Sequence, residues 1–159
     1  MPYPESASKM PVYTSVPGGT EFMGIVTFPL EVGPQHTVLI VDDEPAIRGF
    51  LYDYLSECGF NPLAVESGDA AVRLLEKDNS IDLVFSDVRM PGTLDGFGLA
   101  RWLMEHRPGL PIILASGDLG KINATRELVG AEILPKPYDF DVVVRRMHAA
   151  LDRSAHCRA

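Results

Sequence analysis

Five polar side chains follow apolar segments of the chain in a pattern that could support chemistry. They are Asp42 and Asp43 after "TVLIV", Asp87 at the end of "LVFSD", Ser116 at the end of "PIILAS", and Lys136 after "EILP". Carboxylates that lie close together repel one another, and burial adds to the cost of their charge. A hard divalent cation relieves both effects, and Mg²⁺ suits a few carboxylates, a backbone carbonyl and retained waters. With a lysine and a hydroxyl to hold phosphoryl oxygens, the set favours phosphoryl transfer to a carboxylate.

An alternation of strands and helices from residue 37 would position these side chains. Strands are expected in "TVLIVDD", "FNPLAVES", "IDLVFSD", "LPIILAS" and "AEILPKP", each followed by a helical segment. Their apolar runs are continuous, which is typical of strands buried on both faces, so the pattern predicts an α/β fold with a doubly wound, five-stranded parallel sheet. Ligands bind at the carboxyl ends of such strands. In the order 2-1-3-4-5 the first and third strands are neighbours, and Asp42, Asp43 and Asp87 should converge.

The helices are predicted from apolar residues at helical spacing. In the first helix, which Gly59 ends, these are Ile47, Phe50, Leu51, Tyr54, Leu55 and Cys58. The fourth helix, in residues 117–130, contains glycines and is expected to be less stable than the others. The last helix is predicted over residues 138–153.

Composition divides the chain into three expected regions. Residues 1–35 hold six of the 13 prolines and indicate an extended or flexible extension, within which residues 22–32 could form a strand. Residues 36–153 form the α/β domain, and residues 154–159 a polar tail. No output domain is expected after the last helix.

Charge and cysteine content limit the partners and the compartment. The net charge of −8 disfavours direct binding to nucleic acid, which needs a basic surface. No stretch approaches the roughly 20 apolar residues of a membrane span. The two cysteines indicate no disulfide framework and fit a reducing compartment. We therefore expect a cytoplasmic protein without membrane or nucleic-acid contacts.

The motifs "VLIVDDEP", "DLVFSDVRMPG" with a following "DG", "PIILASG" and "LPKPYD" resemble those of the response-regulator receiver domain of two-component signalling. Four motifs fall in the family's order and spacing, over about residues 36–153. The resemblance implies a flavodoxin-like (βα)5 fold. It also implies that Asp87 is the phosphoacceptor and that Asp43, Asp87 and the backbone carbonyl of Arg89 bind Mg²⁺, with Asp42 acting through a water. Ser116 and Lys136 would contact the phosphoryl group, and the Lys136-Pro137 peptide bond would be cis.

The resemblance implies partners as well. A sensor histidine kinase or a histidine phosphotransfer protein would supply the phosphoryl group, and a downstream protein would receive the signal. A homodimer would use the fourth helix, fifth strand and fifth helix. The protein would catalyse only its own phosphorylation and dephosphorylation. Partner choice would fall on exposed positions beside the site: Ala46, Arg48, Gly49, Tyr138 and Asp139.

Three features depart from the family's usual pattern. Ile133 stands where a switch Tyr or Phe is usual, and we expect it to lie inward. "MPGTLDG" is one residue longer than the commonest loop. Arg89 and Asp118 flank the route of the hydrolytic water, where their charges could pair and shield the phosphoryl group. We therefore expect slow autodephosphorylation.

Several alternatives remain open from the sequence alone. The chain could be a stand-alone receiver, a phosphorelay carrier or phosphate sink, or a module excised from a larger regulator or hybrid histidine kinase. An aspartyl phosphatase would need a second acid at position 89, where Arg89 stands. A nucleotide-binding protein would need a glycine-rich loop after the first strand, where the sequence is "DDEPAIRG". A pseudo-receiver would lack one of the acids or the lysine.

Overall fold

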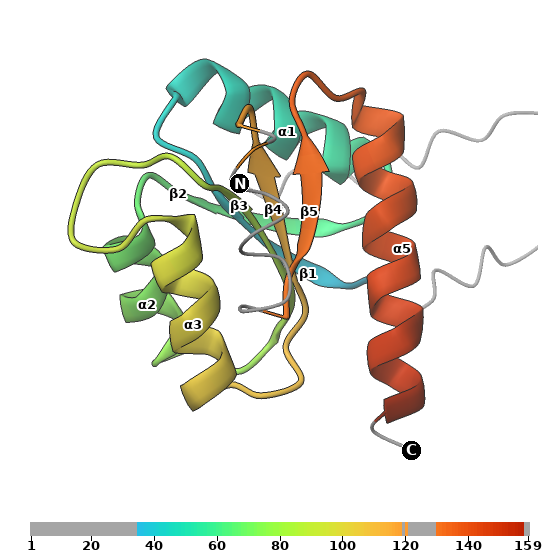
Figure 1. The fold of residues 1–159 in the computed structure, drawn as a ribbon. Helices are drawn as coiled ribbons and strands as arrows, with labels where there is room; N and C mark the ends of the chain where they lie inside the picture. The colour runs from blue at the N-terminus through green and yellow to red at the C-terminus, as the bar shows by residue number, and fades with distance from the viewer. Residues whose placement is uncertain (1–34, 119, 121–129, 158–159) are drawn as a thin grey trace, which may run out of the picture. The chain divides into compact units, whose positions relative to one another are not determined.

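The structure, a computed structural model, describes residues 35–118, 120 and 130–157. These residues build one parallel sheet with the strand order β2-β1-β3-β4-β5. The strands are β1 (Thr37–Val41), β2 (Asn61–Val65), β3 (Ile81–Asp87), β4 (Ile112–Ser116) and β5 (Glu132–Pro135). The arrangement, with strands drawn as arrows in Figure 1, confirms the predicted fold class and strand order.

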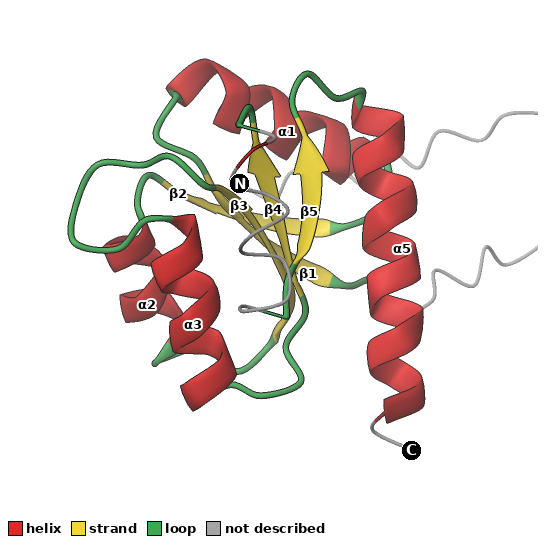
Figure 2. Ribbon diagram, in the orientation of Figure 1, coloured by secondary structure: helices red, strands yellow, loops and turns green. Residues whose placement is uncertain are grey.

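Helices lie on both faces of this sheet. Those in the described residues are α1 (Pro45–Glu57), α2 (Gly68–Leu75), α3 (Gly96–His106) and α5 (Phe140–Cys157). Figure 2 shows α2 and α3 together on one side of the strands, with α1 and α5 on the other. The fourth helix predicted over residues 117–130 falls mostly on residues outside the described part of the chain, as does the N-terminal extension up to residue 34.

Side chains of the central strands enter two hydrophobic cores, one on each face of the sheet. In β1, Leu39 and Val41 pack in the core under α2 and α3, whereas Val38 and Ile40 pack in the core under α1 and α5. Every residue of β1 and β4 is buried. This two-sided burial explains why these strands read as continuous apolar runs rather than as alternation.

Local sequence determines where two of the helices begin. The Ser67 hydroxyl accepts a hydrogen bond from the backbone N–H of Ala70 at 3.1 Å, and Asp95 Oδ1 accepts one from Gly98 at 2.8 Å. These side chains satisfy donors that the first turn of a helix leaves unpaired. They therefore define the starts of α2 and α3, and Asp95 also ends the loop that follows β3.

Two helical predictions need correction. The buried face of α1 is narrower than its apolar spacing suggests, because the helix buries Leu51 and Leu55 while Phe50 is 65% exposed and Cys58 is exposed. The last helix begins at Phe140 and continues beyond the predicted end at residue 153 to Cys157. The Ser154 hydroxyl donates to the Gly109 carbonyl at 3.2 Å, which holds this final turn against the domain.

In the described ranges, no helix is both long enough and apolar enough to cross a membrane.

Candidate functional site

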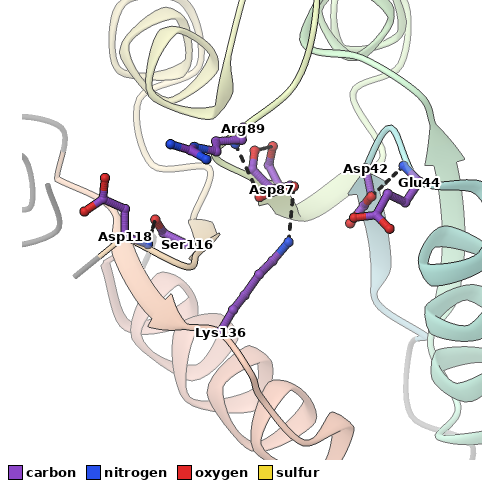
Figure 3. Close-up of polar contacts among 8 residues, drawn as sticks. Asp42, Glu44, Asp87, Arg89, Ser116, Asp118 and Lys136 are labelled. Carbon is purple, nitrogen blue, oxygen red and sulfur yellow. Dashed lines mark hydrogen bonds and ion pairs between the residues drawn. The ribbon is translucent and has the colours of Figure 1, made fainter. Parts of the chain in front are cut away.

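The predicted site residues meet at the carboxyl edge of the sheet. Asp42 and Asp43 directly follow β1, Asp87 is the last residue of β3, Ser116 is the last residue of β4, and Lys136 follows β5. Carboxylate oxygens of Asp42, Asp43 and Asp87 all lie within 4.8 Å of one another. Residues separated in sequence are thus gathered by the order of the strands, and Figure 3 shows Asp87 with the Lys136 side chain extending toward it.

Asp87 is held between a cation and a backbone donor. Its side chain is 8% exposed, and Nζ of Lys136 lies 3.2 Å from Oδ2. The backbone N–H of Arg89 donates to Oδ1 at 3.3 Å. The N–H of Val88 donates to the Ala115 carbonyl at 3.0 Å, which fastens the end of β3 to β4. These contacts fix the position of the Asp87 carboxylate, which also lies close to the carboxylates of Asp42 and Asp43.

Asp42 is 2% exposed, which makes its charge costly. The backbone N–H of Glu44 donates to its Oδ1 at 2.8 Å, and the Arg48 guanidinium donates to its backbone carbonyl at 2.6 Å. Burial raises the pKa of the Asp42 carboxyl most, and the charges of Asp87 and Asp43 raise it further. The Glu44 hydrogen bond and the charge of Lys136 lower this pKa, but the net direction is upward.

This donor set fits a hard divalent cation. The three clustered side chains offer only oxygen ligands, which Mg²⁺ prefers over nitrogen and sulfur. Burial first, and then the charges of Asp87 and Asp43, raise the pKa of Asp42, so the ionised form of this carboxyl is costly in the absence of a cation. A divalent cation bound by the three carboxylates would lower that cost, so the residues present suit the predicted Mg²⁺ site.

A pocket of about 420 Å³ lies beside the acidic cluster. It is lined by Val88, Arg89, Met90, Pro91, Asp95, Phe97, Ser116 and Asp118. The Ser116 hydroxyl accepts a hydrogen bond from the Asp118 N–H at 3.2 Å. Figure 3 shows the Arg89 side chain extending away from Asp87. Among ion pairs between described residues none joins Arg89 to Asp118, so the two charges share a pocket wall without pairing in this structure.

Two further expectations concern β5 and the turn after it. Ile133 is buried in the core under α2 and α3, paired in register with Leu114 of β4. It lies inward, as expected for a side chain without a polar tip. The Lys136-Pro137 peptide bond is cis, as the resemblance implied.

The predicted contact surface is only partly exposed. Ala46, Gly49 and Asp139 are exposed, whereas Arg48 and Tyr138 are half-buried. The Tyr138 ring meets Phe85 edge-on, with centroids 5.8 Å apart. Burial, followed by the charges of Asp42, Asp87 and Glu44, raises the pKa of Tyr138. Tyr138 therefore lies partly against the acidic site and only partly on the predicted contact surface.

Sequence reasoning missed Asp69, which contacts the loop after β3. Its carboxylate accepts hydrogen bonds from the N–H groups of Thr93 and Leu94, at 3.1 and 3.5 Å, and from the Thr93 hydroxyl. The Thr93 hydroxyl and these backbone hydrogen bonds lower the pKa of Asp69, although burial opposes them. The signal available in the sequence was the extra residue in "MPGTLDG", because a longer loop needs an additional anchor.

The fold places this chain in the class of doubly wound α/β proteins, which bind ligands at the carboxyl edge of a parallel sheet. The clustered carboxylates and the lysine at that edge suit a cation bound beside an anionic group. More particularly, the chain belongs to the response regulator receiver domain family, whose model matches residues 38–148.

Individual relatives agree with this assignment. The chain is 33% identical over 124 residues to the transcriptional regulatory protein GlrR of Escherichia coli (strain K12). The aligned region covers 77% of this chain and 27% of GlrR. It is 39% identical over 85 residues to the autoinducer 1 sensor kinase/phosphatase LuxN of Vibrio campbellii, covering 54% of this chain and 10% of LuxN. The chain thus spans less than a third of the length of these curated relatives.

A solved structure covers a similar part of the chain. The crystal structure of a response regulator receiver protein from Sinorhizobium medicae WSM419 superposes with a TM-score of 0.69 at 29% identity, covering 76% of this chain and 98% of that one.

Proposed function

We propose that Asp87 accepts a phosphoryl group in a Mg²⁺-dependent reaction and that the phosphorylated protein signals through contacts with other proteins. The observation that carries this proposal is the position of Asp87, which lies 3.2 Å from Lys136 and within the cluster of Asp42 and Asp43. A carboxylate nucleophile, a cationic partner and oxygen ligands for a metal are the parts that phosphoryl transfer needs.

In the proposed step, a carboxylate oxygen of Asp87 attacks the phosphorus of a phosphohistidine. A new P–O bond forms, the P–N bond breaks, and its electron pair leaves with the imidazole. Asp43, Asp87 and the Arg89 carbonyl would hold Mg²⁺ directly and Asp42 through a water, and the ion would neutralise charge on the phosphoryl oxygens. Lys136 would pair with one of these oxygens, and the Ser116 hydroxyl would donate a hydrogen bond to another.

The proposed donor is a sensor histidine kinase or a histidine phosphotransfer protein in the cytoplasm. Relatives include a protein named as a sensor kinase/phosphatase and one named as a transcriptional regulator, so receiver domains similar to this one are found in both kinds of protein. We place donor recognition around the exposed residues Ala46, Gly49 and Asp139. Output would reach a downstream protein, and a homodimer would use β5 and α5 together with the fourth helix.

A second role within the same chemistry is that of a phosphorelay carrier. The two roles differ in the fate of the phosphoryl group, because a carrier would pass it from Asp87 to another histidine, whereas a terminal switch would keep it to stabilise an active conformation. Transfer from the phosphorylated protein to a histidine phosphotransfer protein would favour the carrier role.

The test is phosphoryl uptake from acetyl phosphate, with Mg²⁺ or with EDTA, followed by intact mass measurement. Wild type should gain one hydroxylamine-labile phosphoryl group only with Mg²⁺, and Asp87→Asn should gain none. Asp82→Asn is the matched control, because Asp82 lies in the same strand and accepts a hydrogen bond from Thr37 at 2.9 Å, away from the site. A wild type that neither gains the group nor binds beryllofluoride would refute the proposal.

A further inference from the structure

The loop between β3 and α3 crosses the first turn of α2. There the Asp69 carboxylate receives two backbone N–H groups and one hydroxyl, from Thr93 and Leu94. Asp69 and these two residues lie 24 and 25 positions apart in sequence. An acid in a first turn is often explained by the helix dipole alone. Here all three side-chain hydrogen bonds to Asp69 come from the loop, which indicates a tertiary role.

Two glycines allow this close approach. Gly92 has φ +112°, and a Cβ atom there would lie 2.7 Å from Asp69 Oδ2. At Gly68, a Cβ atom would lie 2.5 Å from the backbone oxygen of Leu94. A side chain at Gly68 would force the loop away from α2, whereas one at Gly92 would displace the Asp69 carboxylate. The backbone of the loop and the first turn of α2 are therefore in direct contact.

The ends of the loop are held by other groups. At its start, the Arg89 N–H donates to Asp87 Oδ1 at 3.3 Å. At its end, the Gly96 N–H donates to the Val88 carbonyl at 2.9 Å, and Asp95 caps α3. Among the side-chain hydrogen bonds of the described residues, those to residues 92–94 come from Asp69. In this part of the chain, the side-chain hydrogen bonds that hold the middle of the lengthened loop therefore all go to one carboxylate.

We infer that Asp69 is a positioning residue for phosphoryl transfer: together with Thr93 it fixes the loop that carries the Arg89 carbonyl and the Met90–Pro91 wall of the pocket. This inference rests on the proposed function. Asp69 touches neither Asp87 nor a reacting group, and acts by limiting where the loop can lie. The extra residue in "MPGTLDG" is what makes such an anchor necessary, because a longer loop has more conformations to exclude.

The experiment compares Asp69→Ala and Thr93→Val with wild type. Three quantities are measured: amide exchange across residues 88–95, the Mg²⁺ dissociation constant by calorimetry, and the rate of phosphoryl uptake from acetyl phosphate. Asp69→Ala should speed exchange in the loop and raise the Mg²⁺ dissociation constant by about fivefold, the change expected from loss of one hydrogen bond that holds the loop. Thr93→Val, which keeps the backbone donors, should shift all three in the same direction but less.

Asp78→Ala serves as the matched control. Asp78 lies just after α2, accepts a hydrogen bond from the Ser80 N–H at 2.8 Å, and also has a lowered pKa, caused by its hydrogen bonds with Ser80. Its removal should change neither Mg²⁺ affinity nor uptake. The double variant Asp69→Ala/Thr93→Val should match Asp69→Ala alone, because both substitutions break one shared contact.

The outcomes separate the two proposals. If Asp69→Ala speeds loop exchange but leaves both Mg²⁺ affinity and uptake at wild-type values, the positioning role is wrong while the phosphoacceptor proposal stands. If wild type takes up no phosphoryl group yet Asp69→Ala still weakens Mg²⁺ binding, the phosphoacceptor proposal fails while the loop anchor remains supported. If neither exchange nor affinity changes, the anchor itself is refuted.

Discussion

Lys136 and Asp87 form an ion pair across the carboxyl edge of the sheet, with Nζ 3.2 Å from Oδ2. The pair joins the residue after β5 to the last residue of β3, with β4 between them. In this structure the lysine thus compensates part of the negative charge of the cluster that Asp87 forms with Asp42 and Asp43. Under the proposed function, the same ammonium would pair with a phosphoryl oxygen on Asp87.

Removing the lysine should destabilise the metal-free protein. Lys136→Met leaves the buried Asp87 carboxylate without its cation, and Lys136 is itself 26% exposed. We expect the free energy of unfolding to fall by about 1–3 kcal/mol, less than for a fully buried pair. Urea unfolding in EDTA measures it. In a double-mutant cycle, Asp87→Asn should relieve most of the loss, whereas additive effects would show that the pair is not coupled.

Substitution of glycine by alanine should have opposite effects on the free energy of unfolding at two positions, Gly96 and Gly49. At Gly96 an added Cβ would lie 2.4 Å from the Asp87 backbone oxygen and 2.7 Å from Val88 Cα. Because backbone atoms cannot yield, Gly96→Ala should cost about 1–3 kcal/mol or more. At Gly49, inside α1, nothing lies within 4 Å, so Gly49→Ala should stabilise by about 1 kcal/mol. Equal denaturation midpoints for the two variants would contradict this contrast.

Tyr54 should contribute a pH-dependent stability in the alkaline range. Its hydroxyl donates to Asp141 Oδ1, and this hydrogen bond, followed by burial and the charge of Asp141, raises its pKa from 10.0 to about 12. A raised tyrosine pKa stabilises the folded state below pH 10, and the contribution is lost as the pH rises toward 12. The stability difference between wild type and Tyr54→Phe should therefore shrink above pH 10. A tyrosine absorbance titration, with Tyr52→Phe as control, checks the assignment.

The lifetime of the phosphoryl group should depend on Arg89. Arg89 and Asp118 line one pocket beside Ser116 but do not pair in this structure. If Arg89 shields the phosphoryl group from water, Arg89→Ala should shorten its half-life by about fivefold, the equivalent of about 1 kcal/mol. Loss of label after removal of free donor measures the rate, with the exposed Arg101→Ala on α3 as control. An unchanged half-life would show that Arg89 gives no shielding.

The sheet and the meeting of its acidic residues could be predicted because both follow from short-range patterns. Continuous apolar runs identify strands buried on both faces, and each run ends at a polar residue. Once β1 and β3 are neighbours, Asp42 and Asp87 must share an edge. The inward position of Ile133 could be predicted for a similar reason, because a side chain without polar atoms favours the core.

The missed features depend on tertiary contacts whose partners no local pattern identifies. The extra loop residue gave a hint that an anchor was needed, but the path of the irregular loop decides that Asp69 contacts Thr93 and Leu94. Phe50 has the spacing of a core residue, but only the packing of α1 decides which apolar positions are covered. The end of α5 was placed too early because polar residues can continue a helix when one side chain, here Ser154, finds a distant carbonyl.

The order of the strands has a consequence for the newly made protein. Asp87 lies on the third strand along the chain, whereas its cationic partner Lys136 follows the last strand, and β3 is flanked by β1 and β4 in the sheet. A nascent chain that has emerged only as far as α3 would carry all three clustered acids without Lys136. Under the proposed function, competence for phosphoryl uptake should therefore appear late in synthesis, when β5 docks, and a ribosome-bound fragment would compete poorly for the proposed phosphoryl donor.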